Sequence, residues 1–107
     1  MKELTGKQKR FLRGLGQGLT CTAAVGKAGV SRGLAEDVRR QLDTRELLKV
    51  RLPAGPQPQR RRAADELAGA AGAECVGIIG RTGILFRPNE AIGQDARIAL
   101  PPTQPGR

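Results

Sequence analysis

The four residues Gly80-Arg81-Thr82-Gly83 bring together the groups that proteins use to hold a phosphate. A glycine at each end removes the Cβ atom, so the backbone can turn tightly and its N–H groups can approach a large ligand. Between the glycines, Arg81 supplies a positive charge and Thr82 a hydroxyl group, both suited to phosphate oxygens. On these four residues alone, an ordinary hairpin turn that carries an arginine is the commoner explanation, because short glycine motifs often match by chance.

The chain carries a second glycine tetrad, Gly26-Lys27-Ala28-Gly29, followed by Ser31, a favourable helix N-cap. Arg32 stands in the first turn of that helix, where the dipole would favour an acid, so we expect it to meet an anion beside the helix N-terminus. The other candidate phosphate-binding side chains are those of Lys7, Lys9, Arg10, Arg13, Lys49 and Arg51.

Catalytic and metal-binding chemistry finds little support in the composition. The chain has no histidine and two cysteines, Cys21 and Cys75, which lack CxxC spacing. A zinc site therefore lacks ligands, and no Ser-His or Cys-His pair can be assembled. We expect the cysteines to be small buried hydrophobes rather than a disulfide. The carboxylates are mostly placed for ion pairs along helices, so we expect no enzyme activity and no cofactor.

The charge balance favours a polyanionic partner. The 107 residues include 19 lysines and arginines against 10 acidic residues, a formal net charge of +9. Such an excess on a small domain favours nucleic acid, with an anionic membrane surface as the competing interpretation. Only two aromatic residues are present, Phe11 and Phe86. RNA would therefore be held mainly through its backbone and shape rather than by stacked bases.

No apolar run approaches the ~20 residues that span a bilayer. The N-terminal residues also lack the pattern of a secretory signal peptide, a positively charged segment followed by an apolar one. We expect a cytoplasmic monomer without a membrane or small-molecule partner. Residues 1–100 should form a single domain, and residues 101–107 a disordered tail.

Hydrophobic periodicity predicts the elements that position these cations. An amphipathic helix should begin after Thr5 and end near Gly16, although Gly14 and Gly16 weaken its second half. A strand over residues 22–25, a helix from about Ser31 to Asp43 and a strand over residues 48–52 follow. The second strand places Lys49 and Arg51 on its solvent-exposed face. The strand–helix–strand order implies that the two strands pair in parallel.

A third helix should run from near Pro58 through Arg60-Arg61-Arg62 to Ala71, with Gly72 as its stop. For these three arginines, a solvated helix surface is favoured over RNA contact. Two strand-like runs joined by Gly80–Gly83 then form an antiparallel hairpin. Ile98 and Leu100 alternate briefly and could dock as an extended segment.

The predicted architecture is an α/β fold with a mixed four-stranded sheet, in the order helix, strand, helix, strand, helix, strand, strand. The helices should cover mainly one face. Both glycine tetrads would then project beyond the sheet at the edge where α/β folds gather their ligands.

Several segments together resemble a CRM domain, the chloroplast RNA splicing and ribosome maturation module. These segments are Leu4-Thr5 through Gln8, Arg13-Gly14-Leu15, Val25 to Val30, Glu46 to Val50 and Gly80 to Pro88. The joint pattern is specific, although each piece alone is not, and it extends over roughly Leu4 to Leu100. A single copy of this length is similar to the bacterial YhbY-type proteins.

The resemblance implies a small RNA-binding fold similar to the C-terminal domain of translation initiation factor 3, and association with precursors of the large ribosomal subunit. It places the family's G-x-x-G loop on Gly80–Gly83 and its basic closing residue on Arg87. Lys27, Arg32, Arg81 and Arg87 are then expected to converge. Phe86 stands where the family often has tyrosine, so a ring is kept and a hydroxyl contact is lost. The third helix is the least matched region.

We therefore expect a non-catalytic protein that binds structured ribosomal RNA through its phosphates and assists assembly of the large subunit. The alternative is a ribosome-associated protein-interaction or structural module without direct RNA recognition. That alternative predicts tight binding to a ribosomal protein in the absence of RNA.

Overall fold

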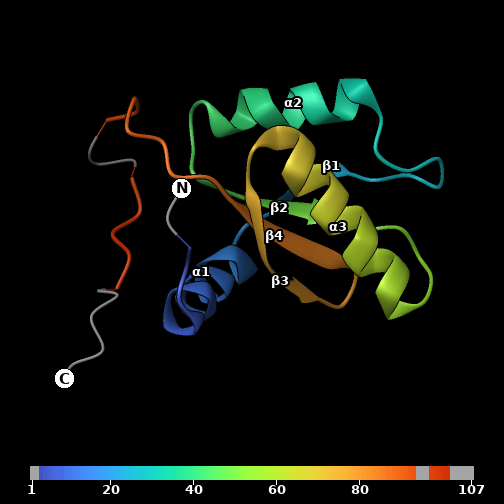
Figure 1. Ribbon diagram of the computed structural model, residues 1–107, viewed down its shortest axis with the longest axis horizontal. Coiled ribbons are helices and arrows are strands. Elements are labelled where there is room, and N and C mark those ends of the chain that lie inside the picture. The colour runs from blue at the N-terminus through green and yellow to red at the C-terminus, as the bar shows by residue number, and fades with distance from the viewer. Residues whose placement is uncertain (1–2, 94–96, 102–107) are drawn as a thin grey trace.

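A four-stranded mixed sheet forms the centre of the protein, with helices packed against both of its faces (Figure 1). The structure is a computed structural model that describes residues 3–93 and 97–101. Its elements are α1 (Gly6–Gln17), β1 (Cys21–Ala24), α2 (Arg32–Leu42), β2 (Leu47–Arg51), α3 (Gln57–Ala71), β3 (Glu74–Ile79) and β4 (Thr82–Phe86). This order confirms the one predicted from the sequence.

The strands lie side by side in the order β1-β2-β4-β3. β1 pairs with β2 in parallel, whereas β4 is antiparallel to both β2 and β3, and both predicted pairings are confirmed. In β2, Val50 is buried, whereas Lys49 is half-buried and Arg51 is exposed. The predicted alternation of buried and accessible side chains is therefore also confirmed. The first strand begins and ends one residue earlier than expected.

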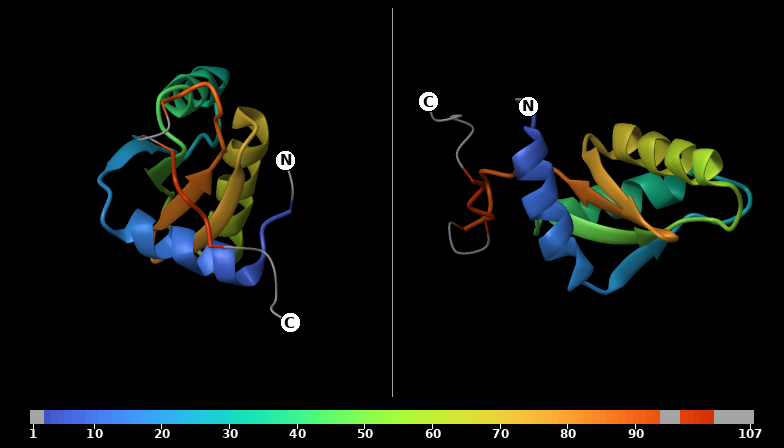
Figure 2. Two further views of the ribbon diagram at one scale, coloured as in Figure 1. Left: turned by 90° about the vertical axis from the view of Figure 1, so that its left-hand side faces the viewer. Right: turned by 90° about the horizontal axis from the view of Figure 1, so that it is seen from below.

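The helices divide between the two faces, so the expectation that they cover mainly one face is wrong. Figure 2 shows α1 across one side of the sheet, with α2 and α3 on the other. The core beneath α2 and α3 includes Val38, Leu42, Leu48, Val50, Leu52, Leu67 and Leu85. The core beneath α1 consists of Leu4, Leu12, Leu47, Val76, Ile84 and Phe86. The consecutive residues Ile84, Leu85 and Phe86 are all buried, as in a strand covered on both faces.

Local sequence signals set the helix ends. The Thr5 hydroxyl accepts a hydrogen bond from the Gln8 N–H, and Gln8 Oε1 accepts one from the Thr5 N–H, both at 3.1 Å. This reciprocal capping box fixes the start of α1. Ser31 caps α2 by accepting a hydrogen bond from the Leu34 N–H at 3.1 Å, as predicted. Gly72 ends α3 in the left-handed region, with φ at 71°.

Gly16 is required by packing rather than being a weakness of α1. A Cβ atom at this position would stand 2.6 Å from Ile84 Cδ1. Helix α1 therefore lies close against β4, and it continues through Gln17, one residue past its expected end.

The segment that follows β4 returns along the α1 side of the sheet and is held there by a buried carboxylate (Figure 2). Glu46, which is 2% exposed, accepts hydrogen bonds from the backbone N–H groups of Asn89 at 2.7 Å and Ile98 at 2.6 Å. Arg97 Nε lies 3.3 Å from the same carboxylate. No local pattern around Glu46 indicates this role, because its partners lie more than 40 residues away along the chain.

Ile98 and Leu100 pack against the core beneath α1, which confirms that this stretch docks as an extended segment. Gln8 Nε2 donates a hydrogen bond to the Pro101 carbonyl at 2.9 Å, so Pro101 belongs to the docked segment rather than to a tail. The rest of the expected tail, residues 102–107, lies outside the described residues. Within the described ranges, no helix is both long and apolar enough to cross a membrane.

Candidate nucleic-acid interface

The loops that carry Lys27 and Arg81 lie at the same edge of the sheet. Ala24 is opposite Arg51 in the paired strands, Arg51 is opposite Thr82, and Thr82 is opposite Ile79. The connections that follow β1, β2 and β3 therefore all leave the sheet at one edge, which we call the loop edge. The sequence predicted this shared edge for the two glycine tetrads.

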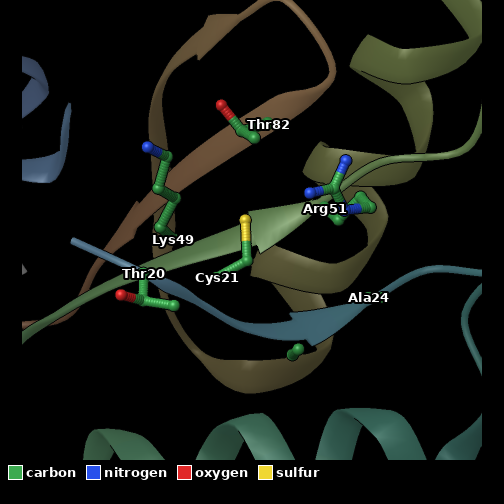
Figure 3. A pocket seen from close by; sticks show the side chains of 7 residues that line it. Thr20, Cys21, Ala24, Lys49, Arg51 and Thr82 are labelled. Carbon is green, nitrogen blue, oxygen red and sulfur yellow. The ribbon is translucent and has the colours of Figure 1, made fainter. Parts of the chain in front are cut away.

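The face of the sheet beneath α1 is covered only in part, and its uncovered portion borders the loop edge. An open depression of about 590 Å³ lies there, lined by Thr20, Cys21, Ala23, Ala24, Lys49, Arg51 and Thr82. Figure 3 shows the side chains of Cys21, Lys49 and Thr82 on three neighbouring strands, with that of Arg51 beside them. We call this surface the open sheet face. Two cations, a thiol and the Thr20 hydroxyl give it hydrogen-bond donors for an anionic ligand.

The cations of the open sheet face and the loop edge are not neutralised by acids. Among the described residues, no carboxylate lies within ion-pair distance of Lys27, Arg32, Lys49, Arg51 or Arg81. Lys49 Nζ donates to the Gln17 carbonyl at the end of α1 at 3.3 Å, which orients the ammonium group without removing its charge. Arg51 and Arg81 are exposed, so their guanidinium groups are accessible to a phosphate.

The tetrad Gly80–Gly83 does not form an open loop with a glycine at each end. Gly80 and Arg81 make the turn, with Gly80 at φ 59°, whereas Thr82 and Gly83 already belong to β4. Gly83 is buried beneath α3, where a Cβ atom would lie 3.5 Å from Ala64 Cβ. Thr82 Oγ1 donates to the Ile79 carbonyl at 2.8 Å and so closes the turn. Gly80 and Arg81 are exposed at the tip, and the expected ligand contact at Gly83 is not supported.

The other tetrad, Gly26–Gly29, is the more open of the two. Its turn is closed by a hydrogen bond from the Gly29 N–H to the Gly26 carbonyl at 3.0 Å, and Gly29 has φ 90°. Lys27 is exposed, and a Cβ atom added at Gly26 would meet nothing within 4 Å. This loop therefore leaves room for a bulky ligand to lie against its backbone.

A hollow of about 470 Å³ separates this loop from α3. Lys27 and Arg62 both line it, together with one acid, Glu66. The sequence favours a solvated helix surface for all three arginines of α3, but in the structure each has a different environment. Arg60 donates to the Gly55 carbonyl, and Arg61 pairs with Asp65 at 3.2 Å. Arg62 borders the hollow because α3 packs beside the Gly26–Gly29 loop, a tertiary relation with no local signal.

Arg87 does not converge with Arg81, and this expectation is wrong. The two residues lie at opposite ends of β4. Arg87 donates to Asp43 Oδ1 at 2.9 Å and to the Ala71 carbonyl at 3.3 Å, and its side chain is 22% exposed. It joins the end of α2 to the end of α3, so its role in the structure is to hold these two helix ends together.

The cations of α1 also have unequal roles. Lys9 pairs with Glu74 at 3.1 Å, at the end of β3 far from the hairpin turn. Arg13 Nη1 donates to the Val76 carbonyl at 3.1 Å, and its stem lies over Gly77, where a Cβ atom would clash with it. The expected continuous basic face is therefore reduced to Lys7 and Arg10, which remain exposed; Arg32, at the start of α2, is exposed as well.

The two cysteines are free, as expected, but only one is buried. Burial raises the pKa of the Cys75 thiol above its ordinary range, so this group stays neutral at physiological pH. Cys21 is half-buried on the open sheet face. Within the described part of the chain, no group of three or more Cys, Asp or Glu side chains is placed to hold a metal ion.

These features define a small α/β domain that presents unpaired cations on one loop edge and on the adjoining open sheet face. The chain matches the CRS1 / YhbY (CRM) domain model over residues 4–87, and it belongs to this family. The predicted resemblance is thereby confirmed.

Relatives match over nearly the whole chain. Probable RNA-binding protein YqeI from Bacillus subtilis is 34% identical over 98 residues, covering 92% of this chain and 99% of that protein. Probable RNA-binding protein MJ0652 from Methanocaldococcus jannaschii is 38% identical over 91 residues, covering 83% and 67%. The solution structure of the hypothetical protein SAV1595 from Staphylococcus aureus superposes with a TM-score of 0.80 at 30% identity, covering 92% of this chain and 100% of that one.

Proposed function

We propose that the protein binds structured RNA without catalysing a reaction, holding the sugar–phosphate backbone against the loop edge and the open sheet face. The observation that carries the proposal is the set of accessible cations there, Lys27, Arg51 and Arg81 above all, without a neutralising carboxylate among the described residues. Like charges held close together destabilise the free protein, and a polyanion relieves that repulsion.

The shape of the surface favours backbone contacts over base recognition. No aromatic side chain lines the open sheet face, so the stacking that holds single-stranded bases has no platform there. Exposed guanidinium groups and an open glycine loop instead suit phosphates presented by a folded RNA. The relatives from Bacillus subtilis and Methanocaldococcus jannaschii are both named probable RNA-binding proteins, which supports the same class of partner.

The finer part of the proposal is that the RNA is ribosomal and that the protein assists assembly of the large subunit in the cytoplasm. This part follows from what the family resemblance implies. Crosslinking of the protein to RNA in cells, mapped to nucleotides, tests it directly. Crosslinks concentrated in precursors of the large-subunit RNA are expected, and crosslinks spread over messenger or transfer RNA would contradict it.

The phosphate-binding surface is tested by salt-dependent RNA affinity. Each phosphate contact should contribute about 0.7–0.9 to the slope of log affinity against log salt. We expect Arg81→Ala and Lys27→Ala each to weaken binding to a structured ribosomal RNA fragment and to reduce the slope by about that amount. Fluorescence anisotropy across a series of salt concentrations measures both quantities.

Arg40→Ala is the matched control, because it removes the same charge from an arginine whose side chain is 71% exposed on α2, away from the proposed surface. If Arg40→Ala changes affinity and slope as much as Arg81→Ala does, binding depends on net charge and not on this surface. If no variant changes either quantity, the alternative of a protein-interaction module without direct RNA recognition is favoured. A pull-down of ribosomal proteins from nuclease-treated lysate would then be the decisive measurement.

A further inference from the structure

Helix α1 presents an apolar stripe to solvent that the RNA-binding proposal does not use. Phe11, Leu15 and Leu19 are 38%, 42% and 37% exposed. They follow one another at four-residue spacing, which places them along one side of the helix. Leu19 stands just past the end of α1, where its N–H bonds to the Gly16 carbonyl at 3.0 Å. We call these three residues the α1 stripe.

One end of the α1 stripe opens into a hollow. Leu15 and Leu19 line a space of about 370 Å³ together with Leu47 and Ile98, and Arg45 and Glu46 complete its lining. The Ile98 wall is fixed in place, because the Ile98 N–H bonds to the buried Glu46 carboxylate at 2.6 Å. A concave apolar site with a fixed wall suits an inserted aliphatic side chain.

The fold itself gives no reason for this surface. Helix α1 is anchored on its other side by Leu12 and Gly16. Gly14 lies beside the stripe, and a Cβ atom there would meet nothing within 4 Å, so packing within the domain does not require a glycine. A glycine inside a helix costs roughly 1 kcal/mol relative to alanine. Gly14 does, however, let another backbone approach α1 closely.

The charges around the stripe indicate which partner fits. Lys7 lies one turn before Phe11 on the same side of α1, Arg10 is beside it, and Arg45 lines the hollow. Lys7, Arg10 and Arg45 have no carboxylate within ion-pair distance among the described residues. Among the described residues that line the hollow, Glu46 is the only acid, and its side chain is 1% exposed and engaged with the segment after β4. Apolar contacts bordered by cations complement an apolar segment bordered by acids.

Other occupants fit less well. A second copy of this chain would bring Lys7, Arg10 and Arg45 against like charges. RNA bases would find a ring only at Phe11, since Leu15 and Leu19 offer no stacking surface. The C-terminal residues 102–107 include no leucine, isoleucine, valine or methionine, and Arg107 would add a further positive charge.

We propose that the α1 stripe and its hollow dock a short amphipathic segment of another protein, one with aliphatic side chains at helical spacing and flanking acidic residues. The residues that line the hollow are distinct from those that line the open sheet face, and they do not include the loop edge, so the proposed docking uses a different surface from RNA binding. The protein would thereby join an RNA to an acidic protein partner.

Site-specific photocrosslinking in cells tests the proposal. A photoreactive amino acid is placed at position 15 of the full chain, and at position 36 on the exposed side of α2 as the control. We expect position 15 to form an adduct with a protein after nuclease treatment, and the crosslinked peptide to carry several aliphatic residues and a net negative charge. Adducts with RNA, lipid, a second copy or a basic segment would overturn the proposal, as would a yield no higher than that at position 36.

The crosslinked segment is then synthesised and titrated against the purified chain. The double variant Leu15→Ser/Leu19→Ser should weaken peptide binding about tenfold or more, because two apolar contacts are lost. Its affinity for RNA, measured well below the melting temperature, should stay unchanged. The melting temperature itself should fall by a few degrees, because the side chains are 42% and 37% exposed and each loses the apolar contacts of its covered part. Equal peptide affinity in the wild type and the double variant would overturn the proposal independently of the crosslink.

Discussion

The two glycine tetrads share a spacing and a central cation, yet they have different roles in the structure. In Gly26–Gly29 the first three residues are exposed, including Lys27, and only Gly29 is half-buried. In Gly80–Gly83 only the first half forms the turn, while Gly83 is buried beneath α3. A G-x-x-G pattern therefore has no fixed meaning. Its position relative to the ends of the strands decides which glycines face a ligand and which allow close packing.

The largest difference between the tetrads should appear in stability. Gly83→Leu would force a large side chain between β4 and α3, where Ala64 Cβ and Leu52 Cδ1 already lie 3.5 and 3.6 Å from the position of a Cβ atom. Such overpacking should lower the free energy of unfolding by about 1–3 kcal/mol. Urea denaturation of the purified variant measures this change.

Gly26→Leu is the matched control in the other tetrad. Its Cβ atom meets nothing within 4 Å, so the free energy of unfolding should change by no more than about 0.5 kcal/mol. Its RNA affinity should fall instead, because the new side chain obstructs the open loop. Equal losses of stability in the two variants would mean that the tetrads are not distinguished by packing.

The sequence predicted most of the fold because the relevant signals are local. Thr5 and Ser31 are capping residues placed before apolar periodicity, and Gly72 is a typical helix stop. The alternation around Lys49 and Arg51 identified both β2 and its wet face. Each of these features depends on residues within a few positions along the chain, so a single sequence is sufficient to detect it.

The errors arose where a residue's role depends on distant parts of the chain. Arg87 is expected from the sequence to converge with Arg81, but its hydrogen-bond partners Asp43 and Ala71 lie 44 and 16 residues away in sequence. Glu46 was not singled out, because its three donors come from the segment after β4. The second helix layer, by contrast, does have a local signal. The unbroken apolar run Ile84-Leu85-Phe86 indicates a strand covered on both faces, and hence a helix on each side.

A smaller effect should distinguish the two arginines at the ends of β4. Arg87→Ala removes hydrogen bonds to Asp43 and to the Ala71 carbonyl, so we expect the free energy of unfolding to fall by about 1 kcal/mol. The effect is smaller than for a fully buried ion pair, because both side chains are partly exposed to solvent. Its salt slope for RNA binding should match that of the wild type. Arg81→Ala should do the reverse, with a lower slope and unchanged stability. Thermal melts and salt titrations of RNA binding with both variants measure these effects. A reduced slope of log affinity against log salt in Arg87→Ala would mean that Arg87 does contact RNA.

The smallest expected effect concerns the path of the RNA from the Gly26–Gly29 loop across the open sheet face. Cys21 lies on the open sheet face, whereas Cys75 is buried and its pKa is raised, so a thiol reagent should modify Cys21 alone in the native protein. If RNA held near Lys27 continues over that face, an RNA concentration equal to Kd should slow alkylation of Cys21 about twofold. Mass spectrometry of the labelled peptides gives the rate.

Lys27→Ala sharpens this measurement. At the same RNA concentration, its weaker binding should leave Cys21 less protected than in the wild type, while the rate without RNA stays the same. Protection that is unchanged in Lys27→Ala would mean that the RNA reaches the open sheet face without contacting the Gly26–Gly29 loop. No protection in either protein would restrict contact to the loop edge, where Arg81 and Lys27 would then act without Lys49 and Arg51.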